Sequence, residues 1–173
     1  VWSLPNGEAF YELRLRTYTT TDATAESIHQ LGLSEVDRIT RRMREIFNGL
    51  GYPTAESVGT LMNSLNEESR FLYGDTPDRK DIVVADYSAI VAATKEAVGS
   101  AFRQLPRADV VVRAVPEYSE KTAAGGYYMS PALDGSRPGV FYANLYDIQQ
   151  TPKYSMRTLA FHEAIPGHHL QNA

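Results

Sequence analysis

The change from helical to extended character along the chain falls at Val110-Val111-Val112-Arg113-Ala114-Val115. Four of these six residues are valine, and such a density of β-branched side chains is typical of a strand. Upstream of it, apolar residues recur at steps of three and four, the spacing of amphipathic helices. The sequence therefore predicts a helical region over 1–105, a small β-sheet region over 106–150 and the start of another helix over 151–173. The expected fold class is mainly α with a small β-sheet (α+β).

Two more strands are expected after the first, at Gly125–Met129 and at Val140–Tyr146, on either side of a turn at Asp134–Gly139. Because side chains alternate between the faces of a strand, the third strand has two distinct sides. One side would carry Phe141, Ala143 and Leu145, and the other Tyr142, Asn144 and Tyr146.

Five helices are expected before the first strand. Cap residues and glycines set most of their limits: Thr24 and Ser34 are predicted N-caps, and Gly32 is a predicted stop. The expected helices cover Glu8–Thr17, Ala25–Leu31, the segment from Ser34 to about Gly49, Ala55–Asn66 with Thr54 as its cap, and about Arg79–Gln104. In the last of these, Val83, Tyr87, Ile90, Val91, Val98 and Phe102 form the expected buried stripe.

Composition bounds the class of protein. The chain has 173 residues, of which 43% are hydrophobic and 22% charged, as in ordinary globular proteins. A net charge of −4 without a basic stripe argues against nucleic-acid binding. The sequence has no apolar run of transmembrane length and no signal peptide. Because it opens with Val1-Trp2, a leader would lie upstream, and localisation stays open between cytoplasm and periplasm or secretion.

The strongest chemical signal is Phe161-His162-Glu163-Ala164-Ile165-Pro166-Gly167-His168-His169-Leu170-Gln171-Asn172, which holds three of the four histidines. Zinc hydrolases present a His-Glu pair and a second histidine on one helix, with the glutamate as general base. On an unbroken helix, histidines seven residues apart would be separated by roughly 10 Å, too far to share one ion. Pro166-Gly167 predicts a break in the helix that brings His168 or His169 back toward His162.

The candidate metal ligands are therefore His162, His168 and His169, and Glu163 is the candidate general base. We expect His168 to be the second ligand, with His169 the alternative. The remaining histidine would donate a hydrogen bond to one of the metal ligands from outside the coordination sphere, or contact the substrate. Simpler interpretations exist for each part. The His-Glu pair suits a solvated helix face, the paired histidines suit a helix C-terminus, and Pro-Gly suits a helix end.

His-Glu-Ala-Ile-Pro-Gly-His-His-Leu-Gln resembles the signature of a bacterial family known as domain of unknown function 885. Two further blocks resemble that family in the same order. They are Thr19-Thr20-Thr21-Asp22 with Ile28-His29-Gln30-Leu31-Gly32-Leu33, and Asp134-Gly135-Ser136-Arg137-Pro138-Gly139 with Phe141-Tyr142-Ala143-Asn144. Members look like zinc-dependent peptidases, so the resemblance implies a zinc cofactor, a peptide substrate and hydrolysis of peptide bonds.

Relatives of this type continue past the motif and take a third zinc ligand, usually glutamate, from a later helix. No acidic residue follows Glu163 here. We therefore expect one incomplete domain with an incomplete zinc site, inactive by itself. Its partner would be the missing C-terminal part of the same protein or a second copy. The alternatives are a non-catalytic fragment and a helical binding module.

Substrate contacts are predicted around the third strand. By analogy with zinc peptidases, Val140–Leu145 is expected to be an edge strand that binds an extended peptide, or else a structural hairpin. Tyr142 and Asn144 lie on this strand, and Arg137 is placed to hold a substrate carboxylate. Several tyrosines are candidates for a hydrogen bond to the tetrahedral intermediate, namely Tyr127, Tyr128, Tyr142, Tyr146 and Tyr154.

Overall fold

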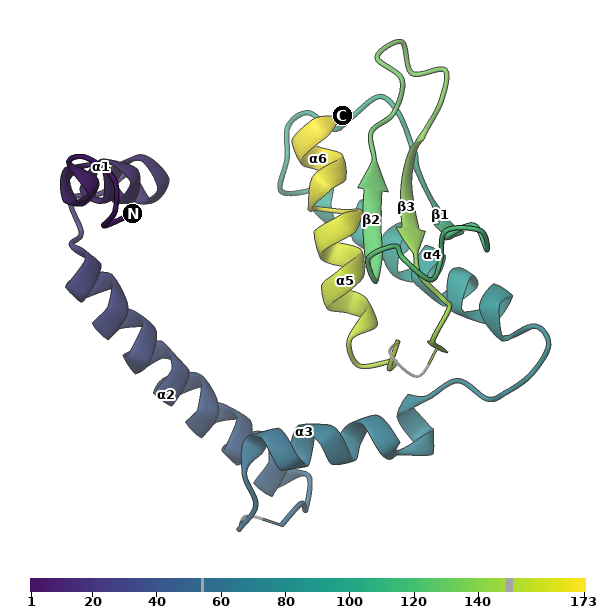
Figure 1. Cartoon of the computed structure of the whole chain (residues 1–173). Helices are drawn as coiled ribbons and strands as arrows, with labels where there is room; N and C mark the ends of the chain where they lie inside the picture. Colours follow the sequence, from purple (N-terminus) through teal and green to yellow (C-terminus); the bar gives the residue numbers. More distant parts are fainter. Residues whose placement is uncertain (54, 149–150) are drawn as a thin grey trace. The chain divides into compact units, whose positions relative to one another are not determined.

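The computed structural model describes residues 1–53, 55–148 and 151–173 (Figure 1). The helices are α1 (Gly7–Thr19), α2 (Ala25–Gly49), α3 (Val58–Glu67), α4 (Arg79–Val98), α5 (Met156–Glu163) and α6 (His168–Asn172), with a short 3-10 helix at Ser69–Phe71. The strands are β1 (Val110–Ala114), β2 (Gly126–Met129) and β3 (Gly139–Ala143). The predicted fold class is thus confirmed, and the chain divides into two compact units, Val1–Met62 and Asn63–Ala173.

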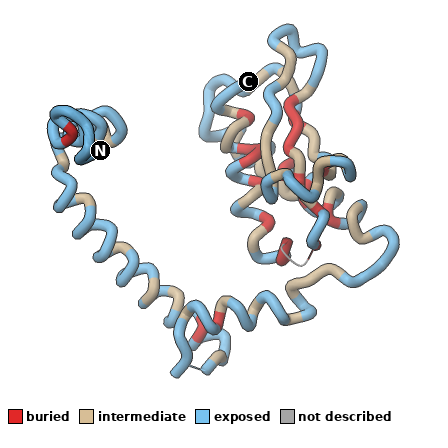
Figure 2. The backbone as a smooth tube through the Cα atoms, in the orientation of Figure 1, coloured by how far each residue is buried: buried red, intermediate tan, exposed pale blue. Residues whose placement is uncertain are grey.

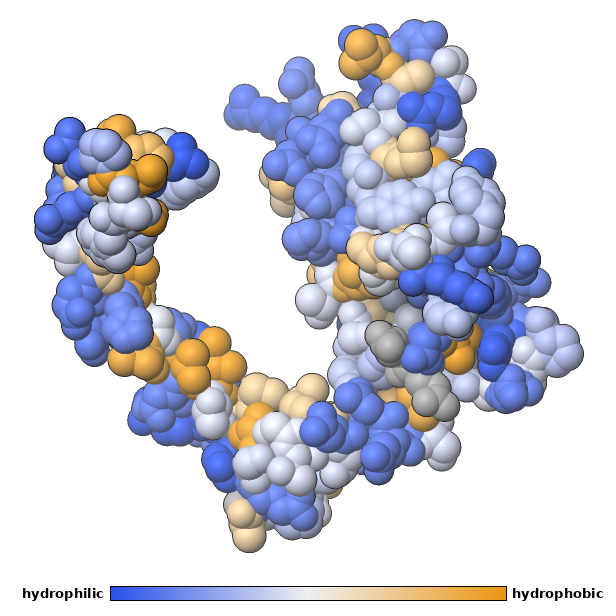
Figure 3. All heavy atoms as spheres, viewed as in Figure 1, coloured by the Kyte–Doolittle hydropathy of each residue, from blue (hydrophilic) through white to orange (hydrophobic). Residues whose placement is uncertain are grey.

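The first unit consists of α1, α2 and the beginning of α3, and most of its residues are exposed (Figure 2). Thr24 is the N-cap of α2, as predicted, and its side chain accepts a hydrogen bond of 3.1 Å from the backbone N–H of Ser27. Near the other end of α2, the ring of Phe47 is buried and meets Tyr52 edge to face. The apolar side chains of α2 that remain exposed appear as orange spheres in Figure 3.

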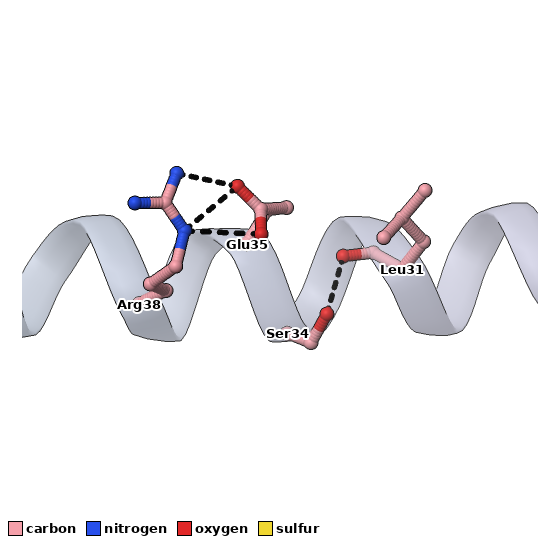
Figure 4. Close-up of polar contacts among 4 residues, drawn as sticks. All are labelled: Leu31, Ser34, Glu35 and Arg38. Atoms are coloured by element: carbon pink, nitrogen blue, oxygen red, sulfur yellow. Dashed lines mark hydrogen bonds and ion pairs between the residues drawn. The ribbon is translucent and has the colours of Figure 1, made fainter.

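The predicted break between two helices at Gly32 and Ser34 is wrong, because α2 runs through both residues. The hydroxyl of Ser34 donates to the carbonyl oxygen of Leu31 at 2.8 Å, a bond within the helix (Figure 4). Such a back-bond lets serine occupy a helix interior, and glycine there costs only about 1 kcal/mol. Arg38 adds an ion pair with Glu35 and holds the pKa of that carboxyl below its usual value through hydrogen bonding.

Two other helix limits differ from the prediction. The predicted cap Thr54 lies outside the described residues, and α3 begins at Val58. Helix α4 ends at Val98 and not at Gln104, so Phe102 lies beyond it and is exposed. The buried stripe of α4 is confirmed at its centre, where Val83, Tyr87 and Val91 are buried.

The second unit is built around a three-stranded sheet of order β1-β3-β2. Strand β3 pairs with β1 in parallel and with β2 in antiparallel orientation. Figure 1 shows α4 behind the sheet and the α5–α6 pair beside β2. The core lies between sheet and helices, where Phe141 of β3 meets Tyr87 of α4 edge to face with ring centroids 5.1 Å apart.

The central position of β3 corrects the expectation that Val140–Leu145 is an edge strand for substrate. Both edges of β3 are hydrogen-bonded to neighbouring strands, so no peptide can add to it. The third strand comes last in the sequence, yet it lies between the other two, and its residues are the most buried of the three strands. Phe141 and Ala143 are almost completely buried, as is Leu145 just beyond the strand.

Candidate metal centre

The break at Pro166-Gly167 divides the motif into α5 and α6. The backbone N–H of Gly167 donates to the carbonyl of Phe161 at 2.8 Å, and the N–H of His169 donates to Ala164 at 3.0 Å. These bonds fold the chain back tightly over the end of α5. A Cβ atom on residue 167 would lie 1.8 Å from the carbonyl oxygen of His162, so only glycine fits.

As a result, His162, Glu163 and His168 come together, and we refer to these three residues as the His-Glu-His cluster. One ligand atom from each lies within 4.8 Å of the others. The Nε2 atom of His162 is 3.9 Å from one carboxylate oxygen of Glu163, and Nε2 of His168 is 4.0 Å from the other. The predicted return of the chain toward His162 is therefore present.

The three side chains differ in their access to solvent. The Glu163 side chain is 12% exposed, whereas His162 is 67% and His168 is 38% exposed. The two imidazole rings meet edge to face with centroids 5.0 Å apart. A cation held by these two open imidazoles would lie at the surface, with the mostly buried carboxylate on its protein side.

The ring nitrogen of His168 that does not face Glu163, Nδ1, has a partner on α6. This Nδ1 atom lies 2.8 Å from the side-chain oxygen Oε1 of Gln171, three residues further along the helix. Sequence reasoning missed Gln171, although a spacing of three on a helix places side chains side by side.

His169 points away from the cluster into the protein. It is 3% exposed, with Nε2 3.1 Å from the carbonyl oxygen of Ala108 and Nδ1 2.8 Å from the hydroxyl of Tyr128. A carbonyl oxygen only accepts, so Nε2 carries the proton, and the Tyr128 hydroxyl donates to Nδ1. Both ring nitrogens are thereby occupied. Burial lowers the pKa of His169 and favours this neutral form, against a smaller opposing effect of the Ala108 hydrogen bond.

Tyr128 of β2 connects the two neighbouring histidines. Its ring stacks on that of His168, with centroids 6.3 Å apart and an angle of 23° between the ring planes. Its hydroxyl donates a hydrogen bond to Nδ1 of His169. Burial raises the pKa of the Tyr128 hydroxyl, and the charge of Arg137 opposes that shift. Gly139 makes room for the ring, because a Cβ there would lie 2.3 Å from the Tyr128 hydroxyl. The sequence offered Tyr128 as one of five candidate tyrosines without indicating this contact.

The described contacts of the predicted substrate residues are with residues outside the His-Glu-His cluster. Tyr142 is on the opposite face of β3 from Phe141 and stacks on Tyr127 with centroids 5.0 Å apart. The amide nitrogen of Asn144 donates to the carbonyls of Glu120 and Ala123, at 2.7 and 3.0 Å. Arg137 lies in the exposed turn between β2 and β3. Substrate contacts by these residues stay a prediction.

A pocket of about 560 Å³ lies next to α6, and none of the three cluster residues lines it. It is formed by the segment between α4 and β1, the β2–β3 turn and the end of the chain, including Leu105, Leu133 and Leu170. The His-Glu-His cluster is the candidate site because of the chemistry of its side chains, although it does not line this pocket.

The donor set of the cluster fits zinc. Imidazole nitrogen is a common zinc ligand, and the glutamate of a His-Glu pair in zinc hydrolases acts as the general base. In a tetrahedral site with bonds of about 2.1 Å, neighbouring ligand atoms lie about 3.4 Å apart. The ligand atoms of His162 and His168 lie within 4.8 Å of each other, and the exposed side chain of His162 has room to rotate inward. The carboxylate oxygens of Glu163, 3.9 and 4.0 Å from the two Nε2 atoms, would lie beside the ion in the place of a base.

The fold and the cluster define a helical α+β protein with a candidate metal centre at a broken helix. Residues 2–173 match the family described as "Bacterial protein of unknown function (DUF885)", and the chain belongs to this family. The resemblance noted from the sequence is thus confirmed. No curated protein matches the chain.

A solved structure supports the fold. The crystal structure of the "putative lipoprotein" from Colwellia psychrerythraea is similar to this chain, with a TM-score of 0.88 and 38% identity over 99% of the chain. The chain spans 29% of the length of that protein. Among the residues that the structure describes, no helix is both long and apolar enough to cross a bilayer.

Proposed function

We propose that this chain carries part of the metal centre of a zinc-dependent peptidase. The observation that supports the proposal is the convergence of His162, Glu163 and His168 across the break at Pro166-Gly167, with ligand atoms within 4.8 Å of one another. His162 and His168 would hold the ion through their Nε2 atoms. The coordination positions that these two histidines leave are open to water, substrate or a further ligand.

Glu163 is assigned the role of general base. A zinc ion bound to the two histidines would supply a Lewis acid that polarises the scissile carbonyl and promotes ionisation of water. One carboxylate oxygen of Glu163 lies 3.9 Å from Nε2 of His162 and the other 4.0 Å from Nε2 of His168, so a water held near both nitrogens would be close to the carboxylate. The carboxylate accepts a proton from the attacking water and then passes that proton to the amine that leaves.

An extended peptide is the substrate class that the sheet suits. Strand β2 is an edge strand, and its Tyr128 packs on His168. The backbone N–H of Asn144 donates to the carbonyl oxygen of Gly125 at 3.0 Å, so these two residues form a hydrogen-bonded pair. Hydrogen-bonded and non-hydrogen-bonded pairs then alternate along β2 and β3. By that alternation Gly126 and Tyr128 direct their backbone N–H and C=O groups to the free edge. A peptide strand would add there, next to the cluster.

The test combines zinc binding with turnover of unstructured peptides by the whole protein that contains this chain. Glu163→Gln should lower kcat by at least about 100-fold, because a general base contributes about 10²–10⁴-fold. Zinc affinity should stay close to that of wild type. Glu117→Gln, which changes an exposed glutamate, is the matched control. Full activity of Glu163→Gln would show that Glu163 is not the general base. Absence of zinc binding by the wild type would contradict the peptidase proposal.

A further inference from the structure

The hydrogen bond between His168 and Gln171 determines which nitrogen of His168 carries its proton. Nδ1 of His168 lies 2.8 Å from Oε1 of Gln171, and an amide oxygen only accepts. Nδ1 is therefore the protonated donor, and Nε2 keeps a free lone pair. This is the nitrogen that lies 4.0 Å from Glu163 in the His-Glu-His cluster.

The ring of His168 is also restrained in orientation. Tyr128 stacks along one of its faces, and His162 meets it edge to face. The contact with Tyr128 resists tilting of the ring, and the bond to Gln171 resists rotation that would turn Nε2 away from the cluster. Neither of the two ring contacts, with Tyr128 or with His162, selects the tautomer, because a ring contact is indifferent to the position of the proton. Only the Gln171 bond does so.

We propose that Gln171 is a positioning residue that holds His168 in the Nδ1–H tautomer and presents its Nε2 lone pair to a cation. An imidazole without a partner exchanges between two tautomers and several orientations, and a cation would have to select the competent one. A hydrogen bond on the outer nitrogen removes this cost before the cation arrives, and it raises the basicity of the inner nitrogen. The tautomer itself is a property of the metal-free protein. Its consequence for zinc rests on the proposed function.

The first measurement is the tautomer of His168 in metal-free protein, read from ¹⁵N chemical shifts and long-range ¹H–¹⁵N correlations of ¹⁵N-histidine-labelled samples. It is made at about pH 8, where an ordinary histidine is neutral. Wild type and Gln171→Glu should show protonated Nδ1, since a carboxylate accepts the same bond. Gln171→Leu should show a mixture or the Nε2–H form. An Nε2–H tautomer in wild type, or an unchanged tautomer in Gln171→Leu, overturns the proposal.

The second measurement is zinc affinity by competition with a chromogenic chelator. Gln171→Leu should bind zinc about 10–100-fold more weakly than wild type, the usual effect of losing an outer hydrogen bond to a ligand. Gln171→Glu should bind at least as tightly. Asn172→Leu is the matched control, because Asn172 is the exposed neighbour on the same helix. It should leave both tautomer and affinity unchanged.

The two measurements separate the inference from the proposed function. If the tautomer changes as expected and Gln171→Leu keeps wild-type affinity, the positioning role toward zinc is wrong. If wild type has protonated Nδ1 yet binds no zinc, the peptidase proposal is wrong, and so is the role of Gln171 in zinc binding. The tautomer assignment itself would then stand. Equal circular dichroism spectra for Gln171→Leu and Asn172→Leu exclude unfolding of α6 as the cause of a difference.

Discussion

His168 and His169 are neighbours in the chain, but their ring nitrogens have different partners. Nε2 of His168 faces Glu163, and its ring is partly open to solvent. His169 is buried, and both of its nitrogens are hydrogen-bonded, to Tyr128 and to Ala108. The sequence favoured His168 as the second ligand and kept His169 as the alternative. In the proposed metal centre the geometry therefore favours His168 as the second ligand, whereas the hydrogen bonds of His169 hold α6 against the sheet.

Replacing each histidine by glutamine should separate these roles. His168→Gln should lower zinc affinity at least about 100-fold, because losing a ligand costs more than losing an outer partner, while stability changes little. His169→Gln should keep zinc affinity close to wild type and lower the free energy of unfolding by about 1–3 kcal/mol, since buried partners are left without their bonds. Zinc competition titration and urea unfolding measure the two effects. The reverse pattern would make His169 the ligand.

Gly167 is the residue on which the shape of the motif depends. A Cβ at this position would overlap the carbonyl oxygen of His162 at 1.8 Å, and that backbone atom cannot move aside without opening the turn. Gly167→Ala should therefore lower the free energy of unfolding by about 3 kcal/mol or more and remove zinc binding. Thermal unfolding with and without zinc provides the measurement.

The control for Gly167 is Gly125→Ala, where a Cβ would meet nothing within 4 Å. It should change the free energy of unfolding by less than about 1 kcal/mol and leave zinc binding intact. If Gly167→Ala behaves like this control, α5 and α6 do not approach each other as closely as the structure indicates.

At the scale of single elements, α2 is one helix where the sequence predicted two. Gly32 lies in its interior, exposed and with open space around its Cα. Gly32→Ala should stabilise the first unit by up to about 1 kcal/mol, because alanine loses less backbone entropy in a helix. Urea unfolding followed by circular dichroism at 222 nm measures the gain.

Gly51 lies just after α2, and Gly51→Ala should lower the free energy of unfolding, the opposite of the effect expected for Gly32→Ala. Gly51 has φ of +83°, a conformation that alanine adopts only with strain, so the substitution should cost about 1 kcal/mol. A loss of stability in Gly32→Ala similar to that in Gly51→Ala would show that the chain bends at Gly32, as the sequence alone suggested.

The strands show how far element prediction reaches. All three strands were predicted, although β3 ends at Ala143 and not at Tyr146. The predicted division of β3 into two sides is present, and the side that bears Phe141 and Ala143 is buried. Their order in the sheet was not predicted. Alternation of apolar residues reports which side of a strand is buried, whereas the choice of neighbouring strands depends on packing between segments far apart in the chain.

At the scale of the molecule, the two units differ in their cores. The second unit contains the main hydrophobic cluster, with α4, β3 and α5 contributing Tyr87, Phe141 and Ala160. In the described part of the first unit, the buried apolar side chains are Phe47 and Leu61. Local stability follows the amount of buried apolar surface.

Hydrogen exchange should reproduce this difference. Amides of α4 and β3 should exchange slowest, and amides of α1 and α2 should exchange earlier, because their helices have little packing to oppose local opening. Exchange followed by mass spectrometry on peptic fragments resolves these segments. Protection of α2 equal to that of β3 would mean that the apolar side of α2 is covered in solution, by a second copy or by another part of the protein.

The amino-acid sequence alone determined the local features of this protein. Periodicity and β-branched residues predicted the helices and strands, Pro166-Gly167 predicted the broken helix, and the motif indicated the family. These features follow from local backbone preferences and from the periodic spacing of buried residues. Both are encoded by residues that lie close together in the sequence.

Only the tertiary structure decided the arrangement of the site. The central place of β3, the burial of His169 and the contact of Tyr128 with both histidines depend on partners distant in the sequence. His169 bonds to Tyr128, 41 residues away, and to Ala108, 61 residues away. Such pairings arise when the whole core packs and every buried polar group must find a partner, a condition that no local pattern encodes.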